Sequence, residues 1–528
     1  MDAKRVLLVY PEFGPTYWGM QYTLPLVGKK AIMPPLALLT LAALSPPEFE
    51  FRLNDINCEP FSERDLEWAD MVCLSAMLPQ KEALVRVARR CRDAGKLVVF
   101  GGPYPTACPE ECEPYCDVMV LNEAEITWPL FLEDLAKGTY RNVYTTTEKP
   151  DVTRTPVPRF DLVSLERYAS VPIQFSRGCP FQCEFCDIIV LFGRTPRTKT
   201  PGQVLAELDA VYKTGYRGSI FIVDDNFIGN RKAAKALLPE IRAWNEARQN
   251  PFTYGTEASV DLAQDDTLIE LMTEARFTDV FLGIETPSME SLNETRKFQN
   301  LKKSLAESVQ RIQTAGLVVQ AGFIIGFDND GKDIFDRQIE FIRQNRIPLA
   351  MVGLLAALPG TPLHERLRNA GRLVPQDRYG AGEDQCGETN VVTVLPRQEL
   401  LEGYRRVLET VYSPGDYFER CLGMLSRLPG PVSQIDPIHE KLSLSQKLVL
   451  IARSLWKLPR GYRRESLRFL WTTLRRFPEQ FPTALAHVFT GLHMYRFTYE
   501  NVSPRLGARL RQLSSSAAGD VREYAPVA

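Results

Sequence analysis

Residues 176–187 read SRGCPFQCEFCD and contain three of the chain's eleven cysteines. Cys179, Cys183 and Cys186 have the spacing C-x3-C-x2-C, and Phe185 stands directly before the last of them. Three thiolates in a loop with glycine and proline can surround one metal ion or small cluster. They leave one coordination position of the metal unfilled. A structural zinc needs a fourth Cys or His nearby, yet all four histidines lie at or after His364. The spacing favours an iron–sulfur cluster in which one iron stays open to an external ligand.

The cysteines follow the first of six apolar, strand-like segments that alternate with helical patterns. Such alternation is typical of parallel β/α folds. We expect a partial (β/α)6 barrel over residues 169–375. Its strands are predicted at 170–178, 219–226, 252–259, 279–286, 318–327 and 350–360.

The first 140 residues show the same alternation and predict a doubly wound, Rossmann-like parallel sheet. Strands are expected at 5–10, 51–55, 71–77, 96–102 and 118–123, with helices around 35–45 and 80–94. Residues 141–168, rich in Pro and Thr, are expected to be a linker. A mainly helical region is expected over 376–512 and a disordered tail over 513–528.

Composition narrows the functional class. A chain of 528 residues with 45% hydrophobic content needs two or three domains. Its formal net charge of −2 excludes a general attraction for nucleic acid. No signal-peptide pattern and no apolar run of membrane-spanning length is present, so we expect a cytoplasmic protein. The cysteines then indicate metal or redox chemistry, or buried thiols, rather than disulfides.

The cysteine motif, set at the end of a barrel's first strand, resembles that of the radical S-adenosylmethionine (SAM) enzymes. The resemblance implies a 4Fe–4S cluster on Cys179, Cys183 and Cys186, with SAM on the open iron. It also implies cleavage of SAM to methionine and a 5′-deoxyadenosyl radical. Phe185 would lie near the adenine.

The family's other SAM contacts follow the next strands. The resemblance carries them to Asp224, Asp225 and Asn226 for the amino group, where the family usually has Gly-Gly-Glu. Glu257 and Ser259 would hold the ribose, and Glu285 would meet the adenosine or methionine. The alternative for these acids is capping of the helices that follow.

The sheet ahead of the barrel resembles the cobalamin-binding domain of one class of these enzymes. Asp55-Ile56-Asn57-Cys58-Glu59-Pro60 occupies the place of the usual Asp-x-His-x-x-Gly, and no histidine precedes His364. The first domain therefore offers no axial imidazole to cobalt. A flavodoxin-like domain that binds another nucleotide, or nothing, is the alternative. The expected cobalamin contacts are Asp55, Asn57, Ser75, Met77, Gly101, Gly102, Asn122 and Glu123.

Nearly the whole chain resembles the cobalamin-dependent radical SAM methylases, and most closely the hopanoid C-2 methylase group. The resemblance is carried by YPEF (10–13), GKKAIMPPLALLTLAAL (28–44), DDNFIGN (224–230) and the helical C-terminal extension. It implies methyl transfer through methylcobalamin to an unactivated sp3 carbon, C-2 of a hopanoid lipid, with flavodoxin or ferredoxin as electron donor. The alternatives are a tetrapyrrole methylase or oxidative cyclase of the same architecture, or a non-enzymatic cobalamin sensor.

A second group of cysteines and a basic C-terminal segment lead to less specific expectations. Cys108, Cys112 and Cys116 are spaced C-x3-C-x3-C without an aromatic residue, and we expect them to be ordinary thiols. Residues 441–489 place apolar side chains at helical spacing among Arg and Lys, and residues 440–528 carry a local charge of +9. Such helices either touch an anionic membrane at the inner face or pack on the barrel with a solvated basic face.

Overall fold

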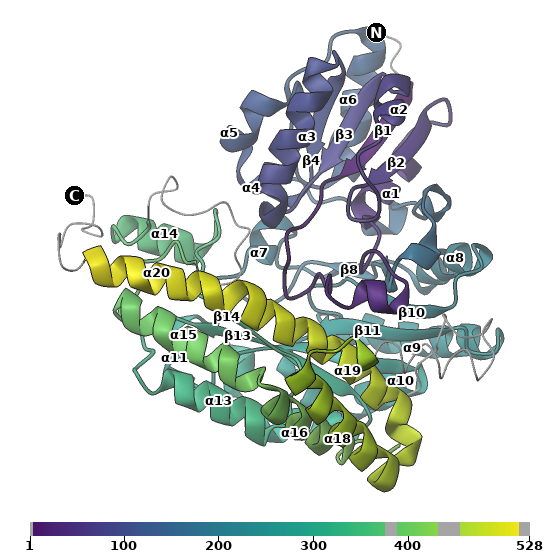
Figure 1. The fold of residues 1–528 in the computed structure, drawn as a ribbon. Helices are drawn as coiled ribbons and strands as arrows, with labels where there is room; N and C mark the ends of the chain where they lie inside the picture. The colour runs from purple at the N-terminus through teal and green to yellow at the C-terminus, as the bar shows by residue number, and fades with distance from the viewer. Residues whose placement is uncertain (1–3, 375–387, 431–454, 517–528) are drawn as a thin grey trace.

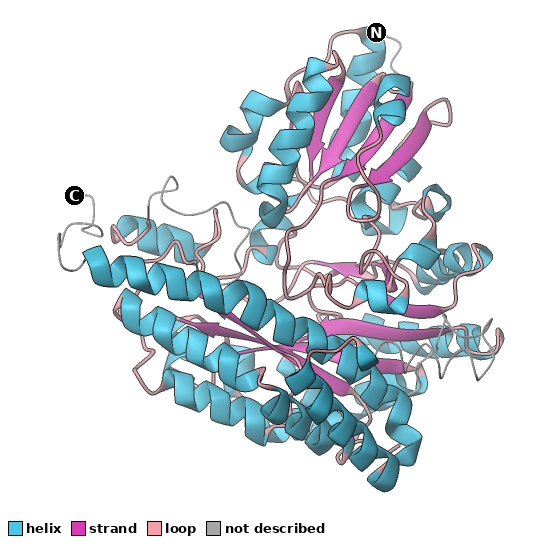
Figure 2. Ribbon diagram, viewed as in Figure 1, coloured by secondary structure: helices cyan, strands magenta, loops and turns pink. Residues whose placement is uncertain are grey.

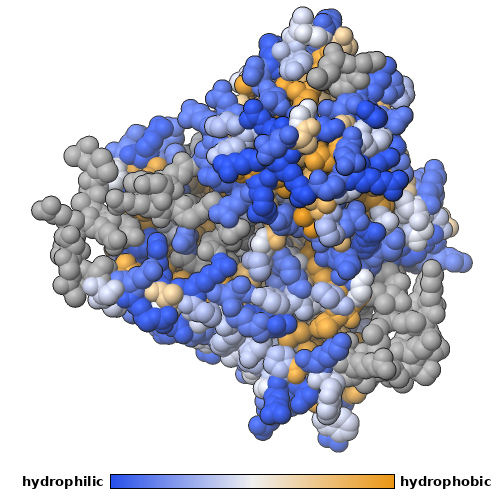
Figure 3. Space-filling view, turned by 45° about the horizontal axis from the view of Figure 1, so that its top comes forward, coloured by the Kyte–Doolittle hydropathy of each residue, from blue (hydrophilic) through white to orange (hydrophobic). Residues whose placement is uncertain are grey.

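The computed structural model describes residues 4–374, 388–430 and 455–516. Figure 1 shows a first sheet with its helices at the top, and below it a second sheet with long helices in front. Most of the surface in Figure 3 is hydrophilic, and hydrophobic patches run down the middle of that face. Across the described ranges, no helix has the length and apolar character needed to cross a membrane.

The first sheet has six parallel strands in the order β2-β1-β3-β4-β5-β6. The five predicted strands are confirmed. A sixth, β6, arises inside the segment expected to be a linker; two residues are too few to produce a recognisable period. The strands are β1 (Arg5–Tyr10), β2 (Glu50–Asp55), β3 (Met71–Ser75), β4 (Leu97–Gly101), β5 (Val118–Val120) and β6 (Val143–Tyr144). Their helices are α1 (Leu36–Leu44), α2 (Glu63–Trp68), α3 (Lys81–Asp93), α4 (Pro103–Ala107), α5 (Pro109–Cys112) and α6 (Ala124–Lys137).

The second sheet has the order β14-β13-β12-β11-β10-β7 and is also parallel throughout, so the expected six-stranded half-barrel is confirmed (Figure 2). Its strands are β7 (Ser170–Ile173), β10 (Gly218–Ile222), β11 (Phe252–Ala258), β12 (Phe277–Glu285), β13 (Val318–Ile325) and β14 (Ala350–Leu354). A short antiparallel pair flanks the cysteine loop, β8 (Ser176–Arg177) and β9 (Arg197–Thr198). The helices are α7 (Ile188–Leu191), α8 (Pro201–Lys213), α9 (Arg231–Glu246), α10 (Asp266–Glu274), α11 (Met289–Glu294), α12 (Leu305–Thr314), α13 (Ile334–Gln344) and α14 (Pro362–Asn369).

The two faces of the second sheet are buried to different degrees. On β12, Val280, Leu282 and Ile284 are fully buried in the core that the sheet forms with its helices. The alternate residues Phe281 and Gly283 are only half-buried, and β13 shows the same alternation. Successive side chains of a strand point to opposite faces, so one face of the half-barrel is partly open to solvent.

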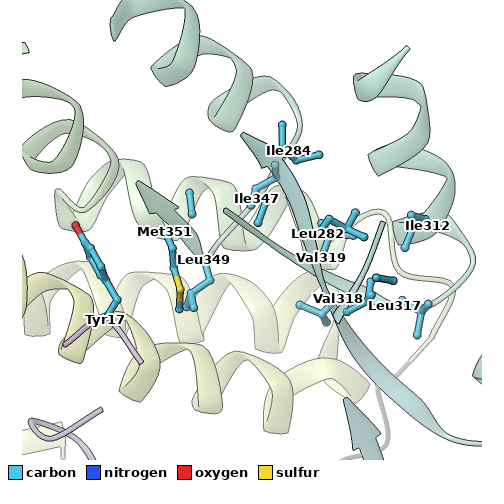
Figure 4. Packing of buried hydrophobic residues seen from close by; sticks show 14 of the residues in the cluster. Tyr17, Leu282, Ile284, Ile312, Leu317, Val318, Val319, Ile347, Leu349 and Met351 are labelled. Carbon is cyan, nitrogen blue, oxygen red and sulfur yellow. The ribbon is translucent and has the colours of Figure 1, made fainter. Parts of the chain in front are cut away.

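The loop after β1, which contains Tyr17 and Trp18, contacts the second sheet and the C-terminal helices. Tyr17 lies in the core of the second sheet, with Leu349 and Met351 (Figure 4), and its ring is 4.6 Å from that of Phe497. Trp18 lies over Phe281 of the half-open face, with 5.0 Å between ring centroids. This loop therefore covers part of that face.

The C-terminal region is helical, as predicted. Its helices are α15 (Arg397–Val411), α16 (Pro414–Leu425), α18 (Arg460–Arg476), α19 (Phe481–Arg496), the π-helical turn Phe497–Val502 and α20 (Ser503–Ser516). The first residues of the expected disordered tail, 513–516, belong to α20. Residues 517–528 and much of the 441–489 segment, up to 454, lie outside the described residues.

Candidate functional site

The cysteine loop leaves the second sheet at the carboxyl end of β7 and runs between β8 and α7. Gly178 makes its first bend possible. Its φ is +92°, and a Cβ there would lie 2.9 Å from the carbonyl oxygens of Gly193 and Thr195. Only glycine fits this close approach of two backbone segments. The chain then places Cys179, Cys183 and Cys186 on one side of the loop.

Two of the three thiols contact polar side chains from other parts of the chain. Asn226, after β10, points its amide Nδ2 at Cys179 Sγ at 3.8 Å, and Gln299 Nε2 lies 3.5 Å from Cys183 Sγ. Burial raises the pKa of the Cys179 thiol, the direction expected before a metal binds. N–H donors aimed at sulfur are the contacts that stabilise thiolate ligands of iron–sulfur clusters.

Cys183 interacts electrostatically with both other thiols, and the ammonium of Lys297 favours the anionic form of Cys179 and Cys186. Within the described ranges no three Cys, His, Asp or Glu side chains close around a single ion. The donor set of three thiols with a cation beside it matches an anionic group larger than one ion. A 4Fe–4S cluster fits these residues.

The loop is held by an ion-pair network on its outer side. The carboxylate of Glu184, between two of the cysteines, is buried and pairs with Arg366 of α14 at 2.5 Å. Arg366 also contacts Asp328 at 3.0 Å. The N–H of Leu363 donates to the carbonyl of Glu184 at 2.9 Å. The start of the C-terminal region thus fixes the cysteine loop.

Asp224, Asp225 and Asn226 divide into different roles. The N–H groups of Phe175 and Ser176 donate to Asp224 at 2.8 Å each, and the Ser176 hydroxyl donates at 2.7 Å. Asp224 is fully buried and holds the strand end before the cysteines. Asn226 Nδ2 also donates to the hydroxyl of Ser259 at 3.2 Å, so these two predicted residues are neighbours.

Asp225 follows β10, while Glu257 and Glu285 stand in the last residues of β11 and β12, so the three carboxylates lie together at the carboxyl ends of these strands. Burial, and next the negative charge of Asp224, raises the pKa of Asp225 to about 7. Burial, followed by the charges of Asp225 and Glu285, raises the pKa of Glu257 to about 8. Glu285 pairs with Lys297 and has a φ of +64°. Because burial and neighbouring carboxylates raise the pKa of Asp225 and Glu257, a positively charged group beside them would stabilise their ionised forms.

Phe185 is half-buried beside this group. Its ring centroid lies 6.1 Å from that of Phe327 and 5.7 Å from the ammonium of Lys297. A flat apolar surface thus stands next to Lys297, the partner of Glu285.

Asp55 and Asn57 support the loop after β1. Asp55 accepts hydrogen bonds from the N–H and the side-chain amide of Asn57, at 2.9 and 2.8 Å, and from the Tyr168 hydroxyl at 2.9 Å. Asn57 in turn accepts from the N–H of Phe13 at 2.9 Å. In this structure both side chains hold the backbone at the carboxyl end of the first sheet.

The ends of β3 and β4 approach each other closely. Gly102 has a φ of +95°, and a Cβ there would lie 2.5 Å from the hydroxyl of Ser75. Met77 stands out in solvent beyond Ser75. Gly101 ends β4, and Asn122, with a φ of +64°, follows β5. Ser75, Gly101 and Gly102 thus leave the carboxyl ends of the central strands β3 and β4 without large side chains, which fits a broad flat ligand such as a corrin.

Glu123 joins the two sheets. Its buried carboxylate contacts Arg177 Nη1 and Arg197 Nη2, at 2.8 Å each. Arg177, two residues before the first cysteine, also contacts Glu125 at 2.7 Å. The start of α6 is thereby bonded to the cysteine loop, and both carboxylate oxygens of Glu123 are occupied.

Cys108 and Cys112 are buried in the core of the first domain, and burial raises the pKa of each thiol to about 12. Cys116 donates to the carbonyl of Cys112. Cys108 and Cys112 thus pack as core residues, and the half-buried Cys116 packs against that core.

Comparison with known proteins places this geometry in a family. Residues 173–342 match the model of the radical SAM superfamily, and residues 361–504 match a domain of unknown function, DUF4070. The hopanoid C-2 methylase of Rhodopseudomonas palustris is 36% identical over 79% of each chain. The chain belongs to the cobalamin-dependent radical SAM methylases. An uncharacterized methyltransferase of Synechocystis is 42% identical over 97% of this chain and 95% of the relative.

Two solved structures share the fold of this chain. The enzyme OxsB with aqua-cobalamin and SAM bound covers 98% of this chain and 84% of its own, with a TM-score of 0.61 and 15% identity. The methyltransferase TsrM of Kitasatospora setae, with cobalamin and a 4Fe–4S cluster, covers 70% of this chain and 78% of its own, with a TM-score of 0.59 and 17% identity. The protein is therefore an enzyme, a radical SAM methyltransferase whose family cofactors are SAM, a 4Fe–4S cluster and cobalamin.

Several residues of this methylase's site escaped the sequence reading. Lys297, Gln299 and Arg366 lie more than a hundred residues from the cysteines and belong to no motif. Arg177 lies within residues 176–187, and a charged residue at the end of a buried strand could have identified it. The other three could not be found from the sequence because they lie far from the cysteines along the chain.

Proposed function

We propose that this methylase transfers a methyl group, through methylcobalamin, to C-2 of a hopanoid lipid. The observation that carries the proposal is the 36% identity with the hopanoid C-2 methylase over 79% of both chains. The overall reaction converts R–H, two SAM and two electrons into R–CH3, S-adenosylhomocysteine, methionine and 5′-deoxyadenosine. One C–H bond breaks and one C–C bond forms. A flavodoxin or ferredoxin is the proposed source of the electrons.

We assign a cofactor to each group of site residues from the chemistry of their side chains. Cys179, Cys183 and Cys186 would hold the cluster, and Asp225 and Asn226 would meet the amino group of SAM. Glu257 and Ser259 would hold the ribose and Glu285 the adenosine or methionine, with Phe185 against the adenine. The carboxyl ends of β3 and β4 would hold the corrin. When bound, these cofactors supply a hydrogen-abstracting radical and a transferable methyl group.

The half-open face of the second sheet supports an apolar substrate. Phe281 and Ile324 present apolar surface there, and Gly283, Gly322 and Gly353 add no side chains. A Cβ on Gly322 would lie 3.1 Å from the Phe281 ring, so glycine keeps this surface flat. Trp18 covers Phe281 from the other side. A rigid hydrocarbon skeleton suits such a surface because it needs few hydrogen bonds.

The test is a substrate panel with the anaerobically reconstituted enzyme. We expect a hopanoid such as diploptene to gain one CH2 unit, and a Phe281→Asp variant to lose this product while it still binds cobalamin. Methylation of a tetrapyrrole instead would replace the substrate assignment, and a product without added mass would indicate a cyclase. A sensor would form no 5′-deoxyadenosine at all.

A further inference from the structure

Helix α18 exposes large apolar side chains to solvent. Leu467 is 49% exposed, Trp471 58% and Leu474 46%, while Trp456, just before the helix, is 76% exposed. The three helical residues are spaced i, i+4 and i+7, so they share one face. The opposite face of α18 is buried, with Tyr462, Ser466, Phe469, Leu470 and Thr473 packed inward.

This exposure is concentrated at one place in the C-terminal region. Among the described residues of that region, 388–430 and 455–516, every exposed large apolar side chain except Val394 belongs to α18 or to Trp456. Helices α16 and α19 bury their apolar faces against α18 and each other. We expected a basic amphipathic pattern over residues 441–489. Within the described part of this segment, the exposed apolar side chains lie on one face of α18.

Positive charge surrounds the apolar face. Between residues 456 and 476 the chain has seven basic side chains and one acid, Glu465. Arg463 lies over the Trp456 ring at 4.8 Å, and Arg475 over the Trp471 ring at 4.7 Å. The basic residues are Lys457, Arg460, Arg463, Arg464, Arg468, Arg475 and Arg476.

We propose that the outer face of α18 docks on an anionic phospholipid bilayer. Trp and Leu side chains favour the boundary between headgroups and acyl chains, while arginines beside them pair with lipid phosphates. Each basic side chain near an anionic surface strengthens this attraction. A second copy of the chain fits poorly, because a two-fold contact would place the same arginines against each other.

This inference rests on the proposed function in one respect: a lipid substrate gives the enzyme a reason to reach the bilayer. The position of α18 suits that task. Figure 1 places it at the end of the molecule far from the first sheet. It packs on α16, whose Arg420 donates to the carbonyl of Ile347, just before β14, at 2.8 Å. Docking there leaves the cofactor side of the molecule free for the electron donor.

The experiment is vesicle co-sedimentation of the full chain, without cofactors or hopanoid. Vesicles of phosphatidylcholine alone are compared with vesicles that also contain phosphatidylglycerol. We expect binding to the anionic vesicles only, weakened by salt, and at least about a tenfold loss of affinity in Trp471→Ala/Leu474→Ala and in Arg464→Gln/Arg468→Gln/Arg475→Gln. The matched control is Leu130→Ala, an equally exposed leucine on α6.

Circular dichroism establishes that each variant is folded, as expected for exposed positions. Equal binding to both vesicle types, or unchanged binding by both variants, would overturn the proposal. A concentration-dependent dimer that Trp471→Ala/Leu474→Ala abolishes, without vesicle binding, would assign the face to self-association instead. Methylation of detergent-solubilised hopanoid by the same variants is a separate readout. If the wild-type enzyme does not methylate the solubilised hopanoid, the proposed function is contradicted. Vesicle binding tests the docking proposal alone.

Discussion

Single residues around the cysteine loop have separable roles. Cys183 is buried, contacts Gln299 and interacts with both other thiols. We predict that Cys183→Ser reduces cluster iron and 5′-deoxyadenosine formation to background, because two thiolates cannot hold the cluster. Iron analysis and product chromatography measure this. Cys112→Ser is the matched control and keeps both, since that thiol is a core residue; equal loss in the two variants would contradict the assignment.

Asp224 and Asp225 are adjacent, but substitution affects them differently. Asp224→Ala leaves two buried N–H groups without their acceptor, which costs about 2–5 kcal/mol of unfolding free energy. Asp225→Asn removes a crowded charge, so we predict unchanged or higher stability together with weaker SAM binding. Denaturant titration and SAM equilibrium dialysis separate the two effects. A large loss of stability in Asp225→Asn would contradict the assignment of Asp225 to SAM binding.

The raised pKa values of Asp225 and Glu257 predict a pH dependence. Folded-state pKa values above the ordinary ones mean that the ligand-free protein loses stability as pH rises from about 4 to 8. A cationic ligand favours the ionised carboxylates, so SAM binding releases protons. We predict that SAM affinity falls as pH drops below about 7, by up to about tenfold per pH unit per proton. Glu257→Gln should flatten the profile; a flat wild-type profile argues against this site.

The sequence predicted the cysteines but assigned Asp224 only by position. Regular spacing after a strand identifies ligands that are local in sequence, such as Cys179 and Cys186. It does not show that the oxygens of Asp224 are taken by backbone N–H groups, or that Lys297 neutralises Glu285, because those contacts depend on tertiary packing.

Among the structural elements, the start of α6 and the cysteine loop form one unit. Removal of one partner from a buried ion-pair network costs about 3–5 kcal/mol. We predict that Arg177→Gln destabilises the protein by about that amount and lowers the ratio of methylated product to 5′-deoxyadenosine, because the two cofactor sites lose their fixed relation. Arg177→Lys should restore part of the ratio.

The control for Arg177 is Arg159→Gln, which breaks the exposed pair with Asp161 and should change stability by no more than about 1 kcal/mol. A lower melting temperature with an unchanged product ratio would show that Arg177 acts only in folding. Strands β10 to β14 were predictable because each has five or more residues, enough for a pattern of buried side chains to be recognised. The pair β8–β9 and strand β6 were not, since two-residue strands have no period.

The whole molecule combines two parallel sheets, a helical extension and the loop with Tyr17 and Trp18 that contacts all three. Apolar alternation predicts each sheet separately. How the sheets meet depends on Glu123, Arg177 and the loop after β1, whose partners lie far away in sequence. The domain boundaries at residues 140, 168 and 375 therefore stay predictions, while the order of architectures is confirmed.

The most direct test of the central claim is product stoichiometry with SAM carrying a deuterated methyl group. The reconstituted enzyme, cobalamin and a hopanoid should give methylated hopanoid, 5′-deoxyadenosine and S-adenosylhomocysteine in equal amounts, with three deuterium atoms retained in the product. Omission of cobalamin should abolish the methylated product. Methylated hopanoid formed without cobalamin, or cobalamin-dependent 5′-deoxyadenosine with no methylated hopanoid, would contradict the account.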